Sequence, residues 1–211
     1  MKNLFDDENI FRPILMPDAD ISILNSFKLP PPYSQLSHDE ILGILSDPAQ
    51  ISWRQEDIKI FGKIYAQPRL IAYYGDEQAQ YHYSSIILKP LPWTDFLRAL
   101  KRQVEQVTGE HFNAVFLNLY RDQNDSMGMH SDDEAELGQN PAIASLSYGA
   151  SRTLIMKHRH EKSRTNIKIP LHSGNLLLMK GTTQHFWKHG INKEKTAHGP
   201  RVNLTFRRVF G

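Results

Sequence analysis

The spacing of apolar residues predicts short strands on either side of one long helix. Between residues 51 and 88, aromatic and β-branched residues come in short runs separated by glycine and proline, a pattern typical of strands and hairpins. From Pro92 to Thr108 the apolar residues instead recur every three or four positions, which predicts an amphipathic helix that ends at Gly109. Such a helix should pack across a sheet.

The second half of the chain is strand-like throughout. Apolar and polar residues alternate from Phe112 to Tyr120, and a polar loop follows at residues 122–125. Further runs of strand length, with turns between them and no helical spacing, lie at Ile143–Tyr148, Thr153–Lys157, Ile167–Leu171, Asn175–Met179 and Arg201–Val209. Strands of this number and length indicate a jelly-roll or barrel of antiparallel sheets, so we expect a mainly β fold with flanking helices, in the α+β class.

The first 50 residues have a different character. Residues 1–36 carry acidic, apolar and proline-rich segments in turn and end in Leu29–Tyr33, whose consecutive prolines require an extended backbone. Ser37, with Glu40 three positions later, then predicts the start of a short helix that ends before Pro48. We therefore divide the chain into an N-terminal extension, residues 1–50, and one folded domain, residues 51–211.

Composition restricts the possible chemistry. The 211 residues are 40% hydrophobic, as in ordinary globular domains, and no apolar run reaches the roughly 20 residues needed to span a membrane. The chain has no cysteine, which excludes disulfides, a thiolate nucleophile and Cys-ligated zinc or iron–sulfur sites, so a metal must be bound by His and carboxylate groups. The net charge of +2 argues neither for nor against nucleic acid. We expect a monomer that is not secreted and has no membrane partner.

A candidate metal site is found at Met129–Asp132. In an extended strand, side chains two residues apart point to the same face, so His130 and Asp132 are able to bind one ion. One imidazole and one carboxylate, completed by a second histidine, form the facial triad of non-haem Fe(II) oxygenases. Because the chain has ten histidines, the alternative is a His and an Asp on a solvated loop.

Four histidines further along the chain are candidates for the third ligand. His158 and His160 lie in a basic stretch that is more typical of a hairpin tip. His185 and His189 follow the apolar strand Asn175–Met179, and spacing alone does not choose between them.

The last predicted strand carries polar side chains on one face. Alternation places on that face Arg201, Asn203, Thr205 and Arg207. Guanidinium groups that point inward need anions, and Arg binds a carboxylate through two parallel hydrogen bonds. A dicarboxylate such as 2-oxoglutarate, with one carboxylate near the metal and one remote from it, would suit this face. The alternative is an outward face with two solvated arginines.

Five segments, in order, resemble the AlkB-type family of Fe(II)/2-oxoglutarate dioxygenases. They are Asn118–Tyr120, Met129–Glu134, Ala144–Ala150, Trp187–His189 and Arg201–Arg207. The resemblance covers about residues 58–209 and implies a double-stranded β-helix (jelly-roll) core with an N-terminal nucleotide-recognition lid at about residues 58–90. It makes residues 51–211 a dioxygenase domain, with Fe(II) as cofactor and 2-oxoglutarate and O2 as cosubstrates.

The resemblance also implies roles for the polar residues. It assigns to the metal and the catalytic centre His130, Asp132 and His189. It assigns to 2-oxoglutarate Asn118, Tyr120, Arg201, Asn203 and Arg207. Arg201 and Tyr120 would hold the remote carboxylate. Arg207 and Asn118 would lie near the metal-binding end, with Asn203 assisting.

Within the lid region the chain is similar to the duplex-DNA-repairing branch of this family. The substrate residues that this likeness implies are Ile60, Phe61, Gly62, Arg69, Tyr81, Tyr83, Ser84, Asp133 and Glu134. Phe61, with Ile60, would insert into the base stack where a damaged base has been flipped out. Tyr83, which is Phe in the branch pattern, and His189 would sandwich the flipped base. The alternative for these aromatic residues is an ordinary hairpin core.

These roles predict an enzyme that oxidatively demethylates N-alkylated bases such as 1-methyladenine and 3-methylcytosine in DNA, which we expect to be duplex, releasing formaldehyde, succinate and CO2. Asp133 and Glu134 would favour a cationic base. The basic hairpin Lys157–Lys168 matches the loop that reaches the complementary strand. Alternatives are a dioxygenase acting on modified RNA or a protein side chain, and a metal-free nucleic-acid-binding jelly-roll module. We expect such a protein in the cytoplasm of a bacterium or the nucleus of a eukaryote.

Overall fold

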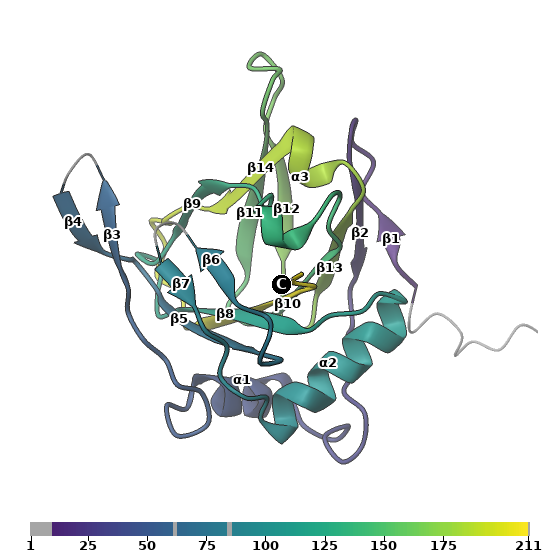
Figure 1. Cartoon of the computed structure of the whole chain (residues 1–211), viewed down its shortest axis with the longest axis vertical. Helices are drawn as coiled ribbons and strands as arrows, with labels where there is room; N and C mark the ends of the chain where they lie inside the picture. The colour runs from purple at the N-terminus through teal and green to yellow at the C-terminus, as the bar shows by residue number, and fades with distance from the viewer. Residues whose placement is uncertain (1–9, 61–62, 84–85, 211) are drawn as a thin grey trace, which may run out of the picture.

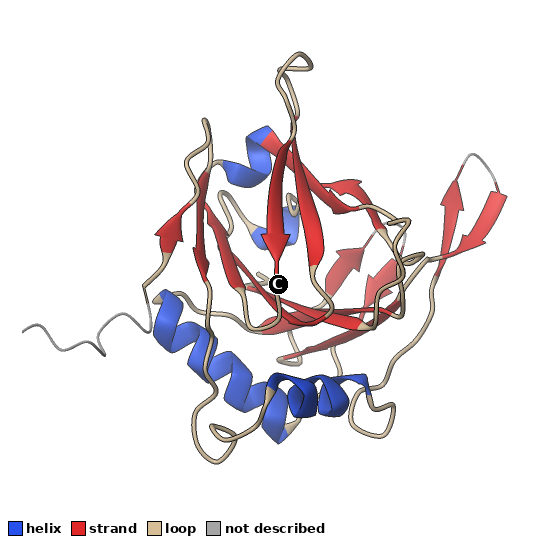
Figure 2. Ribbon diagram, turned by 180° about the vertical axis from the view of Figure 1, so that it is seen from behind, coloured by secondary structure: helices blue, strands red, loops and turns tan. Residues whose placement is uncertain are grey.

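The structure is a computed structural model that describes residues 10–60, 63–83 and 86–210 (Figure 1). For residues 58–60, 63, 81–83 and 86–87 only the backbone is described. Strands dominate and helices are few, so the predicted mainly β class is confirmed. Seen from behind, two helices lie along one side of stacked strands (Figure 2).

Two antiparallel sheets form the body of the molecule. The larger has seven strands in the order β1 (Arg12–Pro13), β2 (Asp20–Leu24), β13 (Leu176–Lys180), β10 (Ile143–Gly149), β15 (Arg201–Arg207), β8 (Ala114–Tyr120) and β5 (Leu70–Gly75). The smaller has four strands in the order β12 (Ile167–Leu171), β11 (Arg152–His158), β14 (Trp187–Ile191) and β9 (Met127–His130). Neighbouring strands are often distant in sequence, so each sheet brings together residues from several parts of the chain.

Two helices cover one face of the larger sheet (Figure 2). Helix α1 (His38–Ser46) begins at a capping box formed by Ser37 and Glu40, as predicted. Helix α2 (Asp95–Thr108) begins after the N-cap Thr94 and ends at Gly109, which has a φ of 71° that glycine adopts without strain. The apolar faces of both helices belong to one buried cluster with leucines of β8, β10 and β15. Each such buried side chain contributes roughly 1.5–3 kcal/mol.

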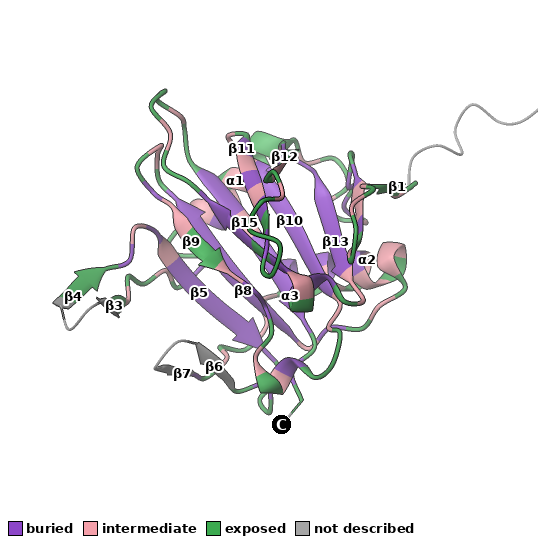
Figure 3. Cartoon of the chain, turned by 90° about the horizontal axis from the view of Figure 1, so that it is seen from above, coloured by how far each residue is buried: buried purple, intermediate pink, exposed green. Residues whose placement is uncertain are grey.

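The opposite face of the larger sheet looks onto the smaller sheet, and a second apolar cluster fills part of the space between them. Trp187 and Met156 of the smaller sheet are fully buried there, as is Phe116 of the larger. The central strands of the larger sheet are buried along most of their length (Figure 3). The molecule therefore has three layers, with helices outside and a core between the sheets.

Two hairpins lie outside both sheets. They pair β3 (Asp57–Ile60) with β4 (Lys63–Ala66), and β6 (Tyr81–Tyr83) with β7 (Ile86–Leu88). The first extends away from the body (Figure 1). Both fall in the segment for which short strands and hairpins were predicted.

Three elements differ from the sequence-based expectations. Strand β2 pairs with β13 and extends the larger sheet, although its five residues were expected only in a wrapped extension. The expectation of no helix in the second half is wrong, because α3 (Thr183–Phe186) and a 3-10 turn at Ala135–Leu137 lie there. Neither is long enough for a helical period to appear in the sequence.

Candidate active site

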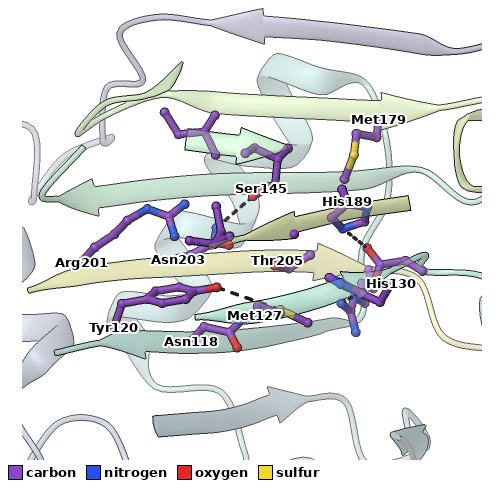
Figure 4. A pocket seen from close by; sticks show the side chains of 16 residues that line it. Asn118, Tyr120, Met127, His130, Ser145, Met179, His189, Arg201, Asn203 and Thr205 are labelled. Atoms are coloured by element: carbon purple, nitrogen blue, oxygen red, sulfur yellow. Dashed lines mark hydrogen bonds and ion pairs between the residues drawn. The ribbon is translucent and has the colours of Figure 1, made fainter. Parts of the chain in front are cut away.

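A pocket lies between the two sheets (Figure 4). The space among its lining side chains, together with the open mouth, is about 460 Å³. Its polar lining residues include Asn118, Tyr120, His130, Asp132, His189, Arg201, Asn203 and Arg207. Arg201 and Tyr120 lie at one end of the pocket, and His130 and His189 at the other (Figure 4).

Two histidines and a carboxylate meet at the second end. His130 is the last residue of β9 and pairs with His189 of β14, so the ring centroids lie 4.3 Å apart. Asp132 lies beyond the end of β9, so the shared strand face that spacing suggested is not formed. The backbone after the strand instead places Asp132 Oδ2 3.6 Å from His189 Nε2. Ligand atoms of the three residues lie within 4.8 Å of one another, close enough to bind one ion.

The hydrogen bond made by His130 determines which of its nitrogens can bind a metal. Its Nδ1 lies 3.0 Å from the carbonyl oxygen of Gly128, and a carbonyl only accepts, so Nδ1 carries the proton and Nε2 keeps its lone pair. A second group in the described part of the chain, Asp18, His158 and Glu161, lacks this arrangement. There the Glu161 backbone N–H donates to Nδ1 of His158, which leaves the proton on the nitrogen facing Asp18. The first group is therefore the better metal site.

Burial and neighbouring charge set the protonation states of this cluster. Burial alone would raise the pKa of Asp132, but Arg207, whose Nη2 lies 2.6 Å from Oδ1, and the two histidines outweigh it, and the pKa falls below its usual value. Burial lowers the pKa of His130, and burial together with His130 lowers the pKa of His189 to about 3. An ionised carboxylate and two neutral imidazoles are the states that metal binding requires.

The remote end of the pocket holds a cation that lacks an anion among the described residues. Arg201 is 1% exposed, and only its Nη2 has a hydrogen-bond partner there, Ser147 Oγ at 2.9 Å. Burial lowers the pKa of Arg201, and the charge of Arg152 adds to this effect, whereas Tyr120 opposes it. The Tyr120 ring lies 5.2 Å from the Arg201 guanidinium carbon. A buried guanidinium with free N–H groups is costly unless a bound anion pairs with it.

Two asparagines between the ends are held in place by their neighbours. Arg69 Nε donates to Asn118 Oδ1 at 2.6 Å, which fixes the orientation of the amide. Asn203 Nδ2 donates to Ser145 Oγ at 2.9 Å and to a backbone carbonyl at 3.0 Å. The two asparagines face each other across β8 and β15.

The donor set and charges fit an iron ion and a dicarboxylate. Two histidines and one carboxylate are the ligands typical of non-haem Fe(II) oxygenases, and all three side chains line the pocket. The buried N–H groups of Arg201 at the other end suit a carboxylate. 2-Oxoglutarate carries a carboxylate at each end and matches both.

A family model for the 2OG-Fe(II) oxygenase superfamily matches residues 29–207. The chain belongs to this superfamily. Fe(II) and 2-oxoglutarate are the cofactor and cosubstrate that the superfamily name specifies. The match begins between β2 and α1 and covers the four-stranded sheet, the other five strands of the larger sheet and all three candidate metal ligands.

Relatives of this oxygenase confirm the predicted AlkB family. The human "Alpha-ketoglutarate-dependent dioxygenase alkB homolog 3" is 44% identical over 173 residues, covering 76% of this chain and 58% of the relative. The human "DNA oxidative demethylase ALKBH2" is 38% identical over 159 residues, covering 72% of this chain and 61% of the relative. The chain thus spans about three fifths of the length of these relatives.

A solved structure shares the fold of this AlkB-family chain. "The structure of OsALKBH1" superimposes with a TM-score of 0.63 at 16% identity, covering 94% of this chain and 100% of the other. At that identity the likeness concerns the fold alone. No helix in the described residues has the length and apolar character needed to cross a membrane.

The structure places every residue predicted for the metal and for 2-oxoglutarate in this one pocket, and their roles stay predictions. His189, and not His185, belongs to the group of candidate metal ligands, because His185 is exposed on α3. Arg201 and Arg207 are buried, so the alternative of two solvated arginines is wrong.

The predicted substrate residues are more dispersed. Arg69 is buried against Asn118. Asp133 is exposed, lines a separate hollow beside α3 and pairs with Arg159 at 2.5 Å, while Glu134 is half-buried. Phe61, Gly62 and Ser84 lie outside the described residues, and for Ile60, Tyr81 and Tyr83 only the backbone is described.

Several residues with clear roles in the geometry were not singled out from the sequence. Ser145 and Ser147 orient Asn203 and Arg201, and their alternation on one face of an otherwise apolar strand was a usable signal. At Gly190 an added Cβ would lie 2.9 Å from the Met127 carbonyl oxygen, so only glycine allows β9 and β14 to approach. That contact has no sequence signal.

Arg152 joins two loops at the remote end of the pocket. Its Nη2 donates to the carbonyl oxygens of Asp125 at 2.9 Å and Asn192 at 2.6 Å. Its Nε lies 3.5 Å from Glu194, and its guanidinium carbon lies 5.6 Å from the Tyr120 ring. One buried side chain therefore fixes the segments that follow β8 and precede β15.

Asp125, in the loop after β8, should make the stability of the fold depend on pH. Burial alone would raise the pKa of Asp125, but its hydrogen bonds with Arg121, with a smaller effect of Arg152, lower it below the usual value. A depressed carboxyl pKa stabilises the fold above the unfolded pKa, roughly 3.9, and this contribution is lost as pH falls through the folded pKa. Because Arg121 is half exposed, Asp125→Asn should cost only about 1–2 kcal/mol at neutral pH.

Urea unfolding of both proteins at several pH values measures this difference, which should shrink as the pH falls below roughly 4. Glu77→Gln, which alters one exposed carboxylate, is the control and should change stability by less than about 0.5 kcal/mol. A difference for Asp125→Asn that is constant across pH would show that the charge of Asp125 is not what stabilises the loop.

Proposed function

We propose that the protein is an Fe(II)/2-oxoglutarate-dependent oxidative demethylase of N-alkylated bases, acting on nucleic acid and expected to prefer duplex DNA. The main observation in its favour is a pocket that combines a His–Asp–His cluster at one end with the buried Arg201 at the other. The name of one relative, a DNA oxidative demethylase, supports the reaction class. When bound, iron and 2-oxoglutarate would supply oxidation of the N-alkyl carbon by O2, with release of succinate, CO2 and, from a methyl group, formaldehyde.

The proposed roles follow from contacts. His130, Asp132 and His189 hold the metal, and Arg207 keeps Asp132 ionised and oriented. Arg201 binds the remote carboxylate of 2-oxoglutarate, beside Tyr120. Arg207 and Asn118, which line the same pocket, would lie near the metal-binding end of that molecule, with Asn203 assisting. The apolar walls exclude water from the reacting atoms.

We further propose that the two facing sheets are the double-stranded β-helix core of a dioxygenase domain at residues 51–211. Residues 1–50 would be an extension that adds β1, β2 and α1 to it. The hairpins β3–β4 and β6–β7 would be the nucleotide-recognition lid, since they are the ribbons outside both sheets in the described residues and occupy residues 57–88.

A repair panel tests the proposal. Oligonucleotides that each carry one lesion, as single-stranded DNA, duplex DNA and RNA, are incubated with the protein, Fe(II), 2-oxoglutarate and O2. Mass spectrometry should find unmodified base, with formaldehyde and succinate formed in equal amounts. Repair of RNA alone would move the substrate class to RNA. Absence of repair in all three kinds of oligonucleotide, with succinate still formed on another substrate, would overturn the proposal that the substrate is a nucleic acid.

The lid proposal predicts a difference between duplex and single strand. If Phe61 fills the gap left by a flipped base, Phe61→Ala should lower duplex repair about tenfold or more, because unstacking costs a few kcal/mol, and single-strand repair much less. Initial rates on matched duplex and single-stranded substrates measure it. Ile64→Ala is the control, because it removes an exposed apolar side chain from the same hairpin. Equal losses on both substrates would count against the insertion of Phe61 into the base stack.

A further inference from the structure

The outer face of the smaller sheet carries three lysines. Lys157 on β11, Lys168 on β12 and Lys188 on β14 are exposed, while their strand neighbours on the other side are buried between the sheets or, for Ile167, partly buried there. The four strands of this sheet contain no Asp or Glu. In the described structure none of the three lysines has an ion-pair partner. We call this surface the lysine face.

Strand register places the three charges close together. Lys157 is directly opposite Lys188 on the neighbouring strand. Lys168 pairs with Ile155, two residues from Lys157, and so lies diagonal to it on the same side. With strands roughly 4.8 Å apart, the lysines cross about 10 Å of sheet. One strand of a duplex carries a phosphate about every 3.4 Å along the helix axis, so this distance corresponds to about three steps between consecutive phosphates along that axis.

Such an arrangement works against the stability of the sheet. Like charges directly opposite each other on neighbouring strands are destabilising. Lysines on an edge strand can serve to prevent pairing with other molecules, and this explains Lys168 on the edge strand β12. It does not explain Lys157 and Lys188, because β11 and β14 are the inner strands of the sheet. A bound polyanion would offset the repulsion.

The hairpin that joins β11 and β12 does not provide the same surface. Arg159 pairs with Asp133 at 2.5 Å, and Arg164 pairs with Glu161 at 2.6 Å. Both arginines thus already contact a carboxylate of the protein. The cations of this region that remain available to a ligand are therefore lysines, and three of them gather on the sheet.

We propose that the lysine face binds the phosphodiester backbone of nucleotides that flank the base in the pocket, which rests on the proposed function. Lys188 and the metal-cluster residue His189 are consecutive in β14 and point to opposite sides of the smaller sheet. A strand that enters the pocket must therefore pass around the edge of this sheet to reach the lysines. Contact with the lysine face requires a long strand, whereas a few nucleotides reach the pocket alone.

The test measures binding of unmodified DNA by fluorescence anisotropy, with no iron and no turnover. The variant replaces Lys157, Lys168 and Lys188 with glutamine. For a single strand of about 25 nucleotides, the slope of log affinity against log salt should become shallower by about 2. The fold-decrease in affinity between about 50 and 200 mM salt should then be about twentyfold smaller for the variant than for the wild type. For about 5 nucleotides the slope should change little. A duplex of equal length distinguishes single-strand from duplex contact.

Two controls make the outcome specific. A variant with glutamine at Arg98, Lys101 and Arg102 removes three positive charges from α2, in the helical layer behind the larger sheet, and should leave the slope near that of the wild type. Arginine at all three positions of the lysine face should restore the slope, which excludes a folding defect as the cause. Equal effects of both glutamine variants, or no effect on the long strand, would overturn the proposal. If the protein repairs no lesion but shows the length-dependent slope, the proposed function is wrong and the proposed binding of nucleic acid by the lysine face is still supported.

Discussion

Replacing Arg201 with methionine is expected to lower the affinity for 2-oxoglutarate by about 100-fold or more while leaving the ligand-free protein as stable as the wild type, or more stable. The affinity falls because the remote carboxylate of 2-oxoglutarate loses a charged, bidentate hydrogen-bond donor, the Arg201 guanidinium. The stability does not fall because Arg201 is buried with two nitrogens unpaired among the described residues, and an apolar side chain of similar length removes that cost. The two effects have opposite signs, which is unusual for a core substitution.

Thermal unfolding with and without 2-oxoglutarate, together with calorimetric titration, measures both effects. Ligand that binds only the folded state should raise the wild-type midpoint and leave that of Arg201→Met unchanged. Without ligand, a gain of about 1 kcal/mol would appear as a rise of about 2–4 °C in the variant. Arg201→Lys is the matched control, since it keeps the charge but not the planar donor pair. A large loss of stability in the ligand-free methionine variant would mean that Arg201 serves the fold and not the cosubstrate.

Replacing Asp132 with asparagine should weaken Fe(II) binding by about 100-fold or more and abolish turnover. Changes around metal ligands commonly cost 10- to 100-fold in affinity, and loss of a charged ligand should cost at least about the upper value. Asparagine keeps the volume of the side chain and an oxygen that can accept from Arg207, so the fold should survive. Anaerobic titration of Fe(II) in the presence of 2-oxoglutarate measures the binding, and succinate release measures the turnover.

The matched control is His185→Ala. This histidine follows the same apolar strand as His189 but lies exposed on α3, outside the metal cluster. Fe(II) affinity in the control should stay within about twofold of the wild type, as for a surface substitution away from the site. If His185→Ala loses iron while Asp132→Asn keeps it, the assignment of the cluster is wrong.

Alternation along strands was enough to predict much of the larger sheet. The apolar and polar positions of β8 and β15 locate both strands, group Asn118 with Tyr120 on one face of β8, and group Arg201 with Arg207 on one face of β15. In the structure both faces turn toward the pocket. Local signals likewise located α1 and α2, because Ser37 and Gly109 mark a start and an end that depend on neighbouring residues only.

What the sequence could not provide depends on contacts between distant segments. His185 and His189 follow the same strand, and only the pairing of β14 with β9 shows that His189 meets His130. Arg69 lies 49 residues from Asn118, so no spacing rule connects them. The opposition of Lys157 and Lys188 is likewise a product of strand register, which alternation within a single strand does not define.

The register between β8 and β15 has a consequence for folding. Arg201 is directly opposite Tyr120 and Asn203 is opposite Asn118, so both halves of the proposed 2-oxoglutarate site are cross-strand neighbours. A slip of one residue between these strands would turn all of one strand's polar side chains toward the helices and all of its apolar ones toward the pocket. Cosubstrate binding would therefore select the correctly registered sheet over every slipped one. In a misfolding-prone variant, 2-oxoglutarate should act as a pharmacological chaperone for the β-sheet as well as a reactant.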